Sequence, residues 1–442
     1  MMKIFSGKNR TCRLSGMLYL TLLTNVSIAQ TYTSYFTGDT SDVVTAPLAG
    51  TVLMGGATEN ENAMRWFLER ADGGDIVVLR ASGDDGYNDY FFEDLGVTVN
   101  SVESIVCLEP ASGSDPYILQ QVQNAEALWF AGGDQWDYVS YWRDTPLEDV
   151  FNDLILNKKI TIGGTSAGCA IQGQAYFSAE NGSVTTNIAL NNPYHNTMTL
   201  GYNDFLQNPF LLNTISDTHY DNPDRRGRHA AFLARLYTDY GVPFFGIGVE
   251  EYTAVCIDEN GLARVYGSYP DYDDYAFFLQ PNCPGPNNPE TCNADDPITW
   301  NRDNAALKVI RIPGTEDGSV SLNLVDWKTL SGADTMWQNW WIEAGDIFYA
   351  ENQQPIDCSV GIIPSTLEAF QVSPNPASTY IQITQPAGTA MEYAIANLEG
   401  KIIQSGIVTG QEKLNIADLP DGMYCISFTH QQIRGSGYFI KL

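Results

Sequence analysis

Basic residues and histidines are both scarce in this chain of 442 residues. It has 23 Lys and Arg against 53 Asp and Glu, which gives a formal net charge of −30 at pH 7. Such a charge repels phosphate backbones and anionic lipid headgroups, so nucleic acid and acidic membranes are excluded as partners. It suits a substrate with cationic groups, and it equally suits an acidic surface that serves only solubility.

Patterns typical of metal centres are missing as well. The sequence contains neither a C-x-x-C nor an H-E-x-x-H pattern, so we expect no metal and no cofactor. The apolar run GMLYLTLL near the start is too short to span a bilayer. Basic residues precede it and Ala29 follows at a suitable cleavage position, which predicts a signal peptide over residues 1–29. We therefore expect the protein to leave the cytoplasm.

The cysteines fit an oxidising compartment. Cys283 and Cys292 bracket the loop PGPNNPET, which a disulfide between them would staple. Cys169 is expected to pack on the helix that follows the GGTSAG turn described below. The remaining cysteines outside the signal peptide and linker are expected to be small buried hydrophobes: Cys107, Cys256 and Cys425.

Apolar runs alternate with helical patterns between residues 50 and 171. The predicted strands are 51–56, 75–82, 101–108, 127–133 and 159–164. Strands that are apolar throughout and separated by helices indicate a parallel sheet covered on both faces. We therefore predict an α/β fold, a doubly wound and mostly parallel sheet in a three-layer sandwich. In such folds ligands bind at the carboxyl ends of the strands.

The pattern changes along the rest of the chain. Short alternating strands with turn signals and no helical period follow a break near residue 351, which predicts a small all-β sandwich. The predicted organisation is a signal peptide, a large α/β domain, a linker and this C-terminal sandwich, over residues 1–29, 30–350, 351–367 and 368–442.

The stretch GGTSAG, Gly163–Gly168, admits two interpretations. It is a tight strand-to-helix turn with an ordinary capping serine, or it is a G-x-S-x-G nucleophile elbow that exposes the hydroxyl of Ser166. Its place at the end of a predicted parallel strand favours the second. Ala167 would then open a helix whose free amide stabilises an oxyanion, and Gly132 or Gly133 on the neighbouring turn AGGDQ would supply a second amide.

A serine nucleophile needs a base, and only four histidines exist. His430 lies in the C-terminal module, His229 is expected on a helix surface, and His195 lies in a loop with no evident partner. His219 follows the mostly apolar stretch PFLLNTIS, where a strand ends and a loop begins. We therefore predict His219 as the base, by the logic of the serine triads.

Four motifs in serial order carry a family resemblance: WFAGGDQ, GGTSAGCAIQG, DTHY with RRGR, and GIGVEEYTA. Over about residues 45–265 the chain resembles the cyanophycinase branch of the S51 serine peptidases, relatives of aspartyl dipeptidase with a class I glutamine amidotransferase-like fold. The resemblance implies a triad of nucleophile Ser166, base His219 and acid Glu180. It also implies that Gln135 and Asp217 bind substrate.

The same resemblance implies arginines that grip substrate carboxylates. Arg225 and Arg228 fall on two of the three family positions, whereas Pro223 occupies the first and Arg226 compensates for it. The implied reaction is hydrolysis of cyanophycin, a polymer of Asp with Arg branches, to Asp-Arg dipeptides through an acyl-enzyme. Alternatives are an Asp-X or isoaspartyl dipeptidase and a non-catalytic surface binding protein. Glutamine amidotransfer is disfavoured because it needs a cysteine at the elbow.

The C-terminal module carries a second resemblance. SPNPAS, the NLEGK turn, LPDGMYCISF and the ending YFIKL resemble the sorting domain of the type nine secretion system of Bacteroidetes, over about residues 368–442. This implies the secretion machinery as a partner and a secreted or cell-surface location. The sequence leaves a homodimer open.

Overall fold

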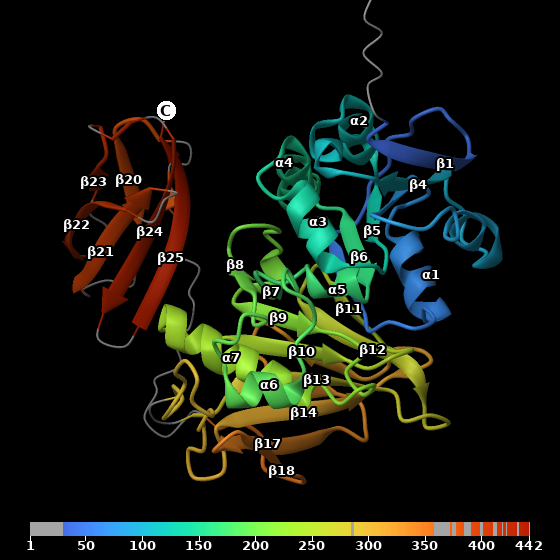
Figure 1. The fold of residues 1–442 in the computed structure, drawn as a ribbon. Helices are drawn as coiled ribbons and strands as arrows, with labels where there is room; N and C mark the ends of the chain where they lie inside the picture. The colour runs from blue at the N-terminus through green and yellow to red at the C-terminus, as the bar shows by residue number, and fades with distance from the viewer. Residues whose placement is uncertain are drawn as a thin grey trace, which may run out of the picture.

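The computed structural model describes residues 30–283 and 287–357 without interruption (Figure 1). In the C-terminal part it describes residues 372–373, 377–383, 390–397, 401–409, 413–417, 419–420, 422–430 and 433–441. The expected signal peptide lies outside the described residues. None of the described helices is both long and apolar enough to cross a membrane.

A ten-stranded sheet forms the first layer of the large domain. Its order is β1-β4-β3-β5-β6-β2-β11-β12-β15-β16. Five neighbouring strands are parallel: β4 (Ser101–Cys107), β3 (Asp75–Arg80), β5 (Ala127–Phe130), β6 (Thr161–Thr165) and β2 (Gly50–Met54). Antiparallel strands extend both sides: β1 (Tyr32–Gly38), β11 (Ala254–Asp258), β12 (Leu262–Tyr269), β15 (Ser321–Asn323) and β16 (Leu330–Ser331).

Helices cover both faces of the parallel strands. Val77 and Leu79 of β3 pack in one core with α2 (Pro116–Asn124), α3 (Gln135–Trp142) and α4 (Pro146–Asp153). Ile76 and Val78, which alternate with them, pack in a second core with α1 (Glu61–Glu69). Short turns of other helix types complete the layer: Tyr90–Asp94, Pro110–Ser114 and Leu154–Lys158. The predicted doubly wound α/β arrangement is confirmed.

A second large sheet, which the sequence did not predict, packs against the first. Its order is β18-β17-β14-β13-β10-β9-β7-β8, and most of its pairs are antiparallel. Its strands are β7 (Ala175–Phe177), β8 (Leu200–Tyr202), β9 (Thr214–Asp217), β10 (Phe245–Val249), β13 (Tyr275–Pro281), β14 (Leu307–Pro313), β17 (Met336–Glu343) and β18 (Asp346–Ala350).

The two sheets share an apolar core. Leu53 and Val255 of the first sheet pack in one cluster with Ile247 and Phe278 of the second. The outer face of the second sheet is covered by α6 (Thr186–Asn191) and α7 (Arg226–Tyr240). The short helix α5 (Ala167–Ala170) lies in the connection from the first sheet to the second, and a turn of helix at Pro209–Leu211 lies between β8 and β9 of the second sheet. The carboxyl ends of β6, β9 and β10 therefore meet at one site.

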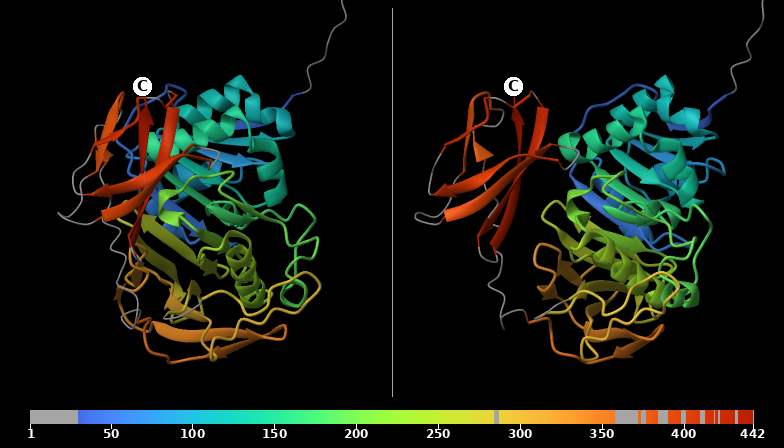
Figure 2. Two further views of the ribbon diagram at one scale, coloured as in Figure 1. Left: turned by 90° about the vertical axis from the view of Figure 1, so that its left-hand side faces the viewer. Right: turned by 60° about the vertical axis from the view of Figure 1, so that its left-hand side comes forward.

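The C-terminal module is all β, as predicted. One sheet contains β19 (Val372–Ser373), β20 (Tyr380–Ile383) and β23 (Lys413–Asn415). The other contains β22 (Ile402–Thr409), β21 (Ala390–Asn397), β24 (Gly422–His430) and β25 (Ile433–Lys441). Both sheets contribute to a core of their own, which includes Ile381, Ile395 and Phe439. Figure 2 shows these strands as a body apart from the large sheets.

Two expectations about single residues are wrong. Cys292 carries a free thiol, buried in the core beside α7, and Cys283 is disulfide-bonded while packing against the core between the sheets. The expected Cys283–Cys292 bridge fails because the two residues pack in different cores. His229 is fully buried rather than at a surface, and burial lowers its pKa to about 4. Its ring meets the Tyr220 hydroxyl and the Ile215 carbonyl.

Candidate active site

Ser166 stands on a sharp turn between β6 and α5. Its backbone has φ 51° and ψ −112°, a combination that residues with a Cβ rarely adopt. The turn requires glycine on both sides of the serine. A Cβ on Gly168 would overlap the Phe130 carbonyl, and one on Gly164 would lie 2.6 Å from the carbonyl carbon of Gly168. The strained backbone and the close strand–helix contact are those of a nucleophile elbow.

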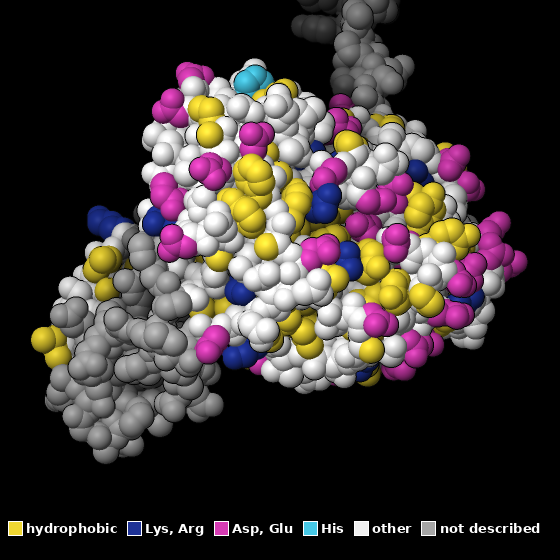
Figure 3. Space-filling model, turned by 90° about the horizontal axis from the view of Figure 1, so that it is seen from below, with side chains coloured by type: hydrophobic (Ala, Val, Ile, Leu, Met, Phe, Trp, Pro, Cys, Tyr) yellow, Lys and Arg dark blue, Asp and Glu magenta, His cyan; other side chains and the backbone are white. Residues whose placement is uncertain are grey.

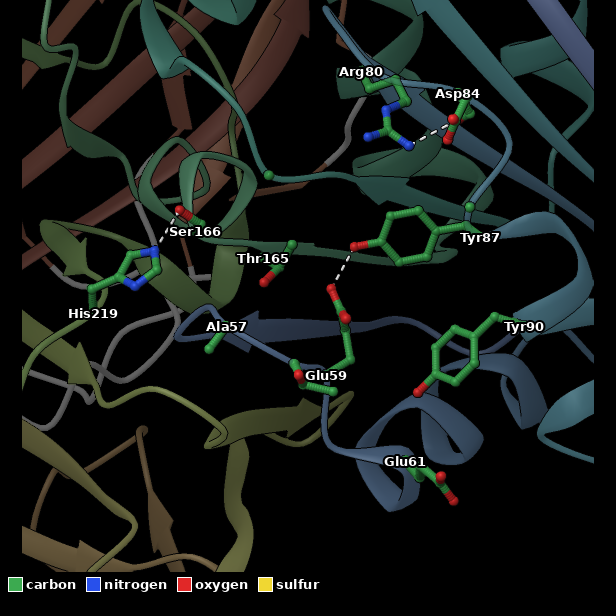
Figure 4. Close-up of a pocket in the computed structure, with 13 residues that line it drawn as sticks. Ala57, Glu59, Glu61, Arg80, Asp84, Tyr87, Tyr90, Thr165, Ser166 and His219 are labelled. Carbon is green, nitrogen blue, oxygen red and sulfur yellow. Dashed lines mark hydrogen bonds between the residues drawn. The ribbon is translucent and has the colours of Figure 1, made fainter. Parts of the chain in front are cut away.

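His219 reaches Ser166 from the second sheet. It follows β9, and its Nε2 lies 2.8 Å from the Ser166 Oγ (Figure 4). Its backbone N–H donates to the carbonyl of Gly55, at 2.8 Å, just beyond β2 of the first sheet. Gly56 has φ 123°, and a Cβ there would overlap the imidazole ring. The loop after β2 therefore fixes the position of the histidine.

Glu251 completes a chain of hydrogen bonds. Its Oε1 lies 2.6 Å from the Nδ1 of His219, and its side chain is 17% exposed. With a proton on Nδ1 donated to this carboxylate, Nε2 is left to accept the hydroxyl proton of Ser166. The backbone N–H of Glu251 donates to Asp221 Oδ1 at 3.0 Å, which ties the loop after β10 to the loop after β9.

The acid expected at Glu180 is not the partner of His219. Glu180 is exposed in the turn after β7, where its backbone N–H donates to Ser178 Oγ at 3.4 Å. Nδ1 is instead occupied by Glu251, because β9 and β10 are parallel neighbours and Asp217 pairs with Gly248. The motif GIGVEEYTA carried this glutamate, but only the end of β10 at Val249 shows that it stands beyond a strand.

The expected oxyanion amides lie at the elbow. Ala167 is the first residue of α5, so its N–H has no intrahelical acceptor. Gly132 adjoins Ser166, because a Cβ on it would lie 3.7 Å from that of Ser166. Gly133 faces α3 instead, where a Cβ would lie 3.1 Å from the Tyr138 hydroxyl. Ala167 and Gly132 are therefore the two of these residues that adjoin Ser166.

The Ser166 hydroxyl opens into a cleft of about 660 Å³ (Figure 4). Most of its charged lining is acidic: Glu59, Glu61 and Asp84. Glu59 accepts a hydrogen bond from the Tyr87 hydroxyl. Arg80 is the basic member, and its guanidinium Nη1 donates to the Asp84 carbonyl at 2.8 Å. The cleft therefore offers carboxylates to a cation and one guanidinium to an anion.

Asp217 and Arg228, two expected substrate ligands, lie away from this cleft. They are 2% and 3% exposed and bind each other in a fork, with Nε–Oδ2 at 2.8 Å and NH2–Oδ1 at 2.5 Å. Burial alone would raise the pKa of Asp217, but the Arg228 guanidinium outweighs it, and the pKa lies below its usual value. A paired and buried fork supports the end of β9 and is closed to substrate, so the expectation is corrected.

Other expected ligands are also engaged elsewhere. Arg226 pairs with Asp224 and lies over the Tyr349 ring, with 4.6 Å from its guanidinium carbon to the ring centroid. Arg225 donates to the Thr218 carbonyl at 3.0 Å, directly before His219. Gln135 donates to the Phe177 carbonyl at 3.4 Å. None of the three is part of the cleft lining, and their binding of substrate stays a prediction.

Within the described part of the chain, no three His, Cys, Asp or Glu side chains gather as a metal site would require. Separately, the hydrogen bonds from Ser166 to His219 and from His219 to Glu251 hold a hydroxyl, an imidazole and a carboxylate in line.

Comparison with known proteins finds two family models that match parts of the chain. Residues 86–265 match the model of Peptidase family S51, and residues 371–441 match that of a secretion system C-terminal sorting domain. The chain therefore resembles S51 peptidases over its central region and sorting domains over its end. Ser166, His219 and Glu251 all fall within the first match.

The curated relatives include cyanophycinases. The chain is 24% identical to a cyanophycinase from Trichormus variabilis over 40% of its own length and 53% of the relative's. It is 25% identical to one from Synechococcus elongatus over 46% of its length and 59% of the relative's. The chain thus spans somewhat more than half of these relatives. A solved peptidase structure from an acI-B1 actinobacterium matches half of this chain and 89% of its own, with a TM-score of 0.38 and 13% identity.

Proposed function

We propose that the chain is a serine peptidase that cleaves peptide bonds next to aspartyl units. The observation that carries the proposal is the hydrogen-bonded line of Ser166, His219 and Glu251 at an open cleft. Ser166 is the nucleophile, His219 the general base, and Glu251 the acid that orients and charge-stabilises the imidazole.

The first half of the reaction forms an acyl-enzyme. Oγ of Ser166 bonds to the carbonyl carbon while its proton passes to Nε2 of His219. The carbonyl oxygen becomes an oxyanion that accepts hydrogen bonds from the N–H groups of Ala167 and Gly132. The C–N bond then breaks, and the leaving amine takes the proton from Nε2.

The second half releases the acyl group. A water molecule gives its proton to Nε2 and bonds to the ester carbon, through a second oxyanion in the same place. The bond to Oγ then breaks, and the serine regains its proton. Throughout, the Glu251 carboxylate stabilises the imidazolium and holds the ring in its orientation. A neutral side chain at that position would not stabilise the positive charge.

Cyanophycin, a polymer of Asp with Arg branches, is the proposed substrate. Two features support it: the relatives are cyanophycinases, and the cleft carries the carboxylates of Glu59, Glu61 and Asp84, which suit guanidinium groups. An Asp-X or isoaspartyl dipeptidase is the second candidate. It is favoured by Arg80, whose guanidinium in the same cleft suits a free carboxylate.

The location is proposed from the two ends of the chain. The C-terminal match to a secretion sorting domain supports export to the cell surface or the medium through type nine machinery, and the expected signal peptide would serve the first membrane. A homodimer stays a prediction.

The test is hydrolysis of cyanophycin by the purified chain, with products identified by mass spectrometry. We expect Asp-Arg dipeptides from the natural sequence and none above background from Ser166→Ala. Ser140→Ala, in α3 and absent from the cleft lining, is the matched control and should keep full activity. Equal release by Ser166→Ala would overturn the proposed nucleophile, and release of Asp from Asp-X dipeptides alone would select the second candidate.

A further inference from the structure

A second hollow lies next to the catalytic cleft. Its volume is about 490 Å³, and it shares Thr58, Glu59 and Glu61 with the cleft as lining. The segment 58–61, which links β2 to α1, is therefore a ridge between two hollows. An extended chain that lies with one unit at Ser166 has a second depression directly across this ridge.

The chemistry of the second hollow suits a planar cation. Tyr252 and Tyr269 contribute aromatic rings, and the ring of Tyr252 is exposed. The other charged lining beyond the ridge is mainly acidic, from Asp271 and Glu316. The face of a planar guanidinium stacks on a tyrosine ring, while the N–H groups at its edge donate hydrogen bonds to carboxylates. Acidic side chains are also spread over the face of the molecule drawn in Figure 3.

Arg65, the one basic residue that lines this hollow, is not the cation that the tyrosines and Asp271 would bind. Arg65 pairs with Glu61 at 2.7 Å, one turn along α1, and also donates to Asn62 and the Leu95 carbonyl. Its contacts lie along α1 and toward residue 95. Among the described residues, Asp271 forms no ion pair, and no Lys or Arg stacks on the ring of Tyr252 or Tyr269.

Backbone contacts fix the position of the hollow relative to the proposed catalytic residues. Tyr252 directly follows Glu251, and its backbone N–H donates to the Gly56 carbonyl at 3.1 Å. Gly56 in turn packs against the ring of His219. A group seated beside Tyr252 is therefore at a fixed separation from the reacting bond.

We propose that this second hollow is a binding subsite for a guanidinium side chain of a substrate unit distant from the cleaved bond. The inference rests on the proposed function and deepens it, because it makes the protein selective for a polymer over a single dipeptide. Tyr252 and Tyr269 stack on the cation, and Asp271 neutralises it. The subsite adds affinity and leaves the chemical step at Ser166 unchanged.

The experiment measures binding separately from cleavage. The full chain with Ser166→Ala is titrated by calorimetry with a synthetic tetramer of the Asp-Arg repeat and with the single Asp-Arg dipeptide. Tyr252→Ala and Asp271→Asn are each introduced into it, with Tyr272→Ala as matched control, since Tyr272 is an exposed neighbour outside both hollows. We expect about tenfold weaker tetramer binding for each of the first two, and no change for the control or the dipeptide.

Two results would overturn the subsite. One is tetramer binding unchanged by both variants, and the other is an equal loss for tetramer and dipeptide, which would mean that the variants disturb the main cleft. The proposed function is tested apart from this, by dipeptide release from the polymer by the natural chain. If release fails while the tetramer still binds and Asp271→Asn weakens it, the subsite stands and the proposed reaction does not.

Discussion

Glu251 Oε1 lies 2.6 Å from His219 Nδ1, although 32 residues separate the two in the chain. Each stands two residues beyond the end of its strand, β9 or β10, and these strands are parallel neighbours. We expect Glu251→Gln to lower kcat by about 10³–10⁴-fold, because an amide neither stabilises the imidazolium nor enforces the tautomer. Steady-state hydrolysis of cyanophycin is the measurement.

Glu180→Gln is the control for that change, since Glu180 is exposed and outside the hydrogen-bonded line. It should retain activity close to that of the natural sequence. If Glu180→Gln loses activity and Glu251→Gln keeps it, the assignment of the acid is reversed.

Gly56 sets how closely the loop after β2 approaches the base. Gly56→Ala forces a methyl group into the His219 ring and a side chain onto a backbone with φ 123°. We expect kcat to fall by about 10²-fold, because a displacement of the base by about 1 Å is costly.

The matched control is Gly96→Ala, which has φ 69° and open space around its Cβ position. It carries the backbone penalty without the contact. Similar activity in the two variants, measured on proteins of equal circular dichroism, would show that the histidine has room to move.

The Asp217–Arg228 fork is predicted to serve stability. Arg228→Met leaves a buried carboxylate without its partner, which should cost about 3–5 kcal/mol of unfolding free energy in urea titrations. Arg226→Met, which breaks the more exposed pair with Asp224, should cost about 1 kcal/mol or less. A stable Arg228→Met protein with only a raised KM would restore Arg228 as a substrate ligand.

Glu250, the neighbour of the proposed triad acid, links stability to alkaline pH. Burial raises its pKa to about 8, and its Oε2 accepts from the Tyr275 N–H at 2.7 Å. Because its pKa is higher in the folded state than in the unfolded state, the folded state holds the extra proton between pH of about 4.5 and about 8. The contribution of Glu250 to the free energy of unfolding is therefore complete below this pH range and is lost as the pH rises through it.

Glu250→Gln keeps the acceptor and removes the titration. We expect the variant to melt at a higher temperature than the natural sequence at pH 9, and the difference to vanish at pH 4. Differential scanning calorimetry at both values is the check. A difference that is constant with pH would show that Glu250 titrates normally in the folded protein.

Much of the fold followed from local pattern. The five parallel strands are apolar on both sides, and Ile76 and Val77 indeed pack into opposite cores. The sharp strand-to-helix turn at Ser166 also followed from the sequence, because the close approach of strand and helix tolerates only glycine at positions 164 and 168. The scarcity of histidine then left few candidates for a base, and strand-end position favoured His219.

Long-range pairing decided the rest. The sequence could not show that β9 and β10 lie side by side, and that pairing brings Glu251 rather than Glu180 to His219. It could not show that Arg228 is drawn into the core by Asp217, or that Cys283 and Cys292 pack in different cores. Motifs determined which chemical groups the chain carries. The pairing of β9 with β10 inside the second sheet, and the packing of that sheet on the first, decided which of them meet. Contacts between residues on different strands and sheets leave no periodic pattern in a single sequence.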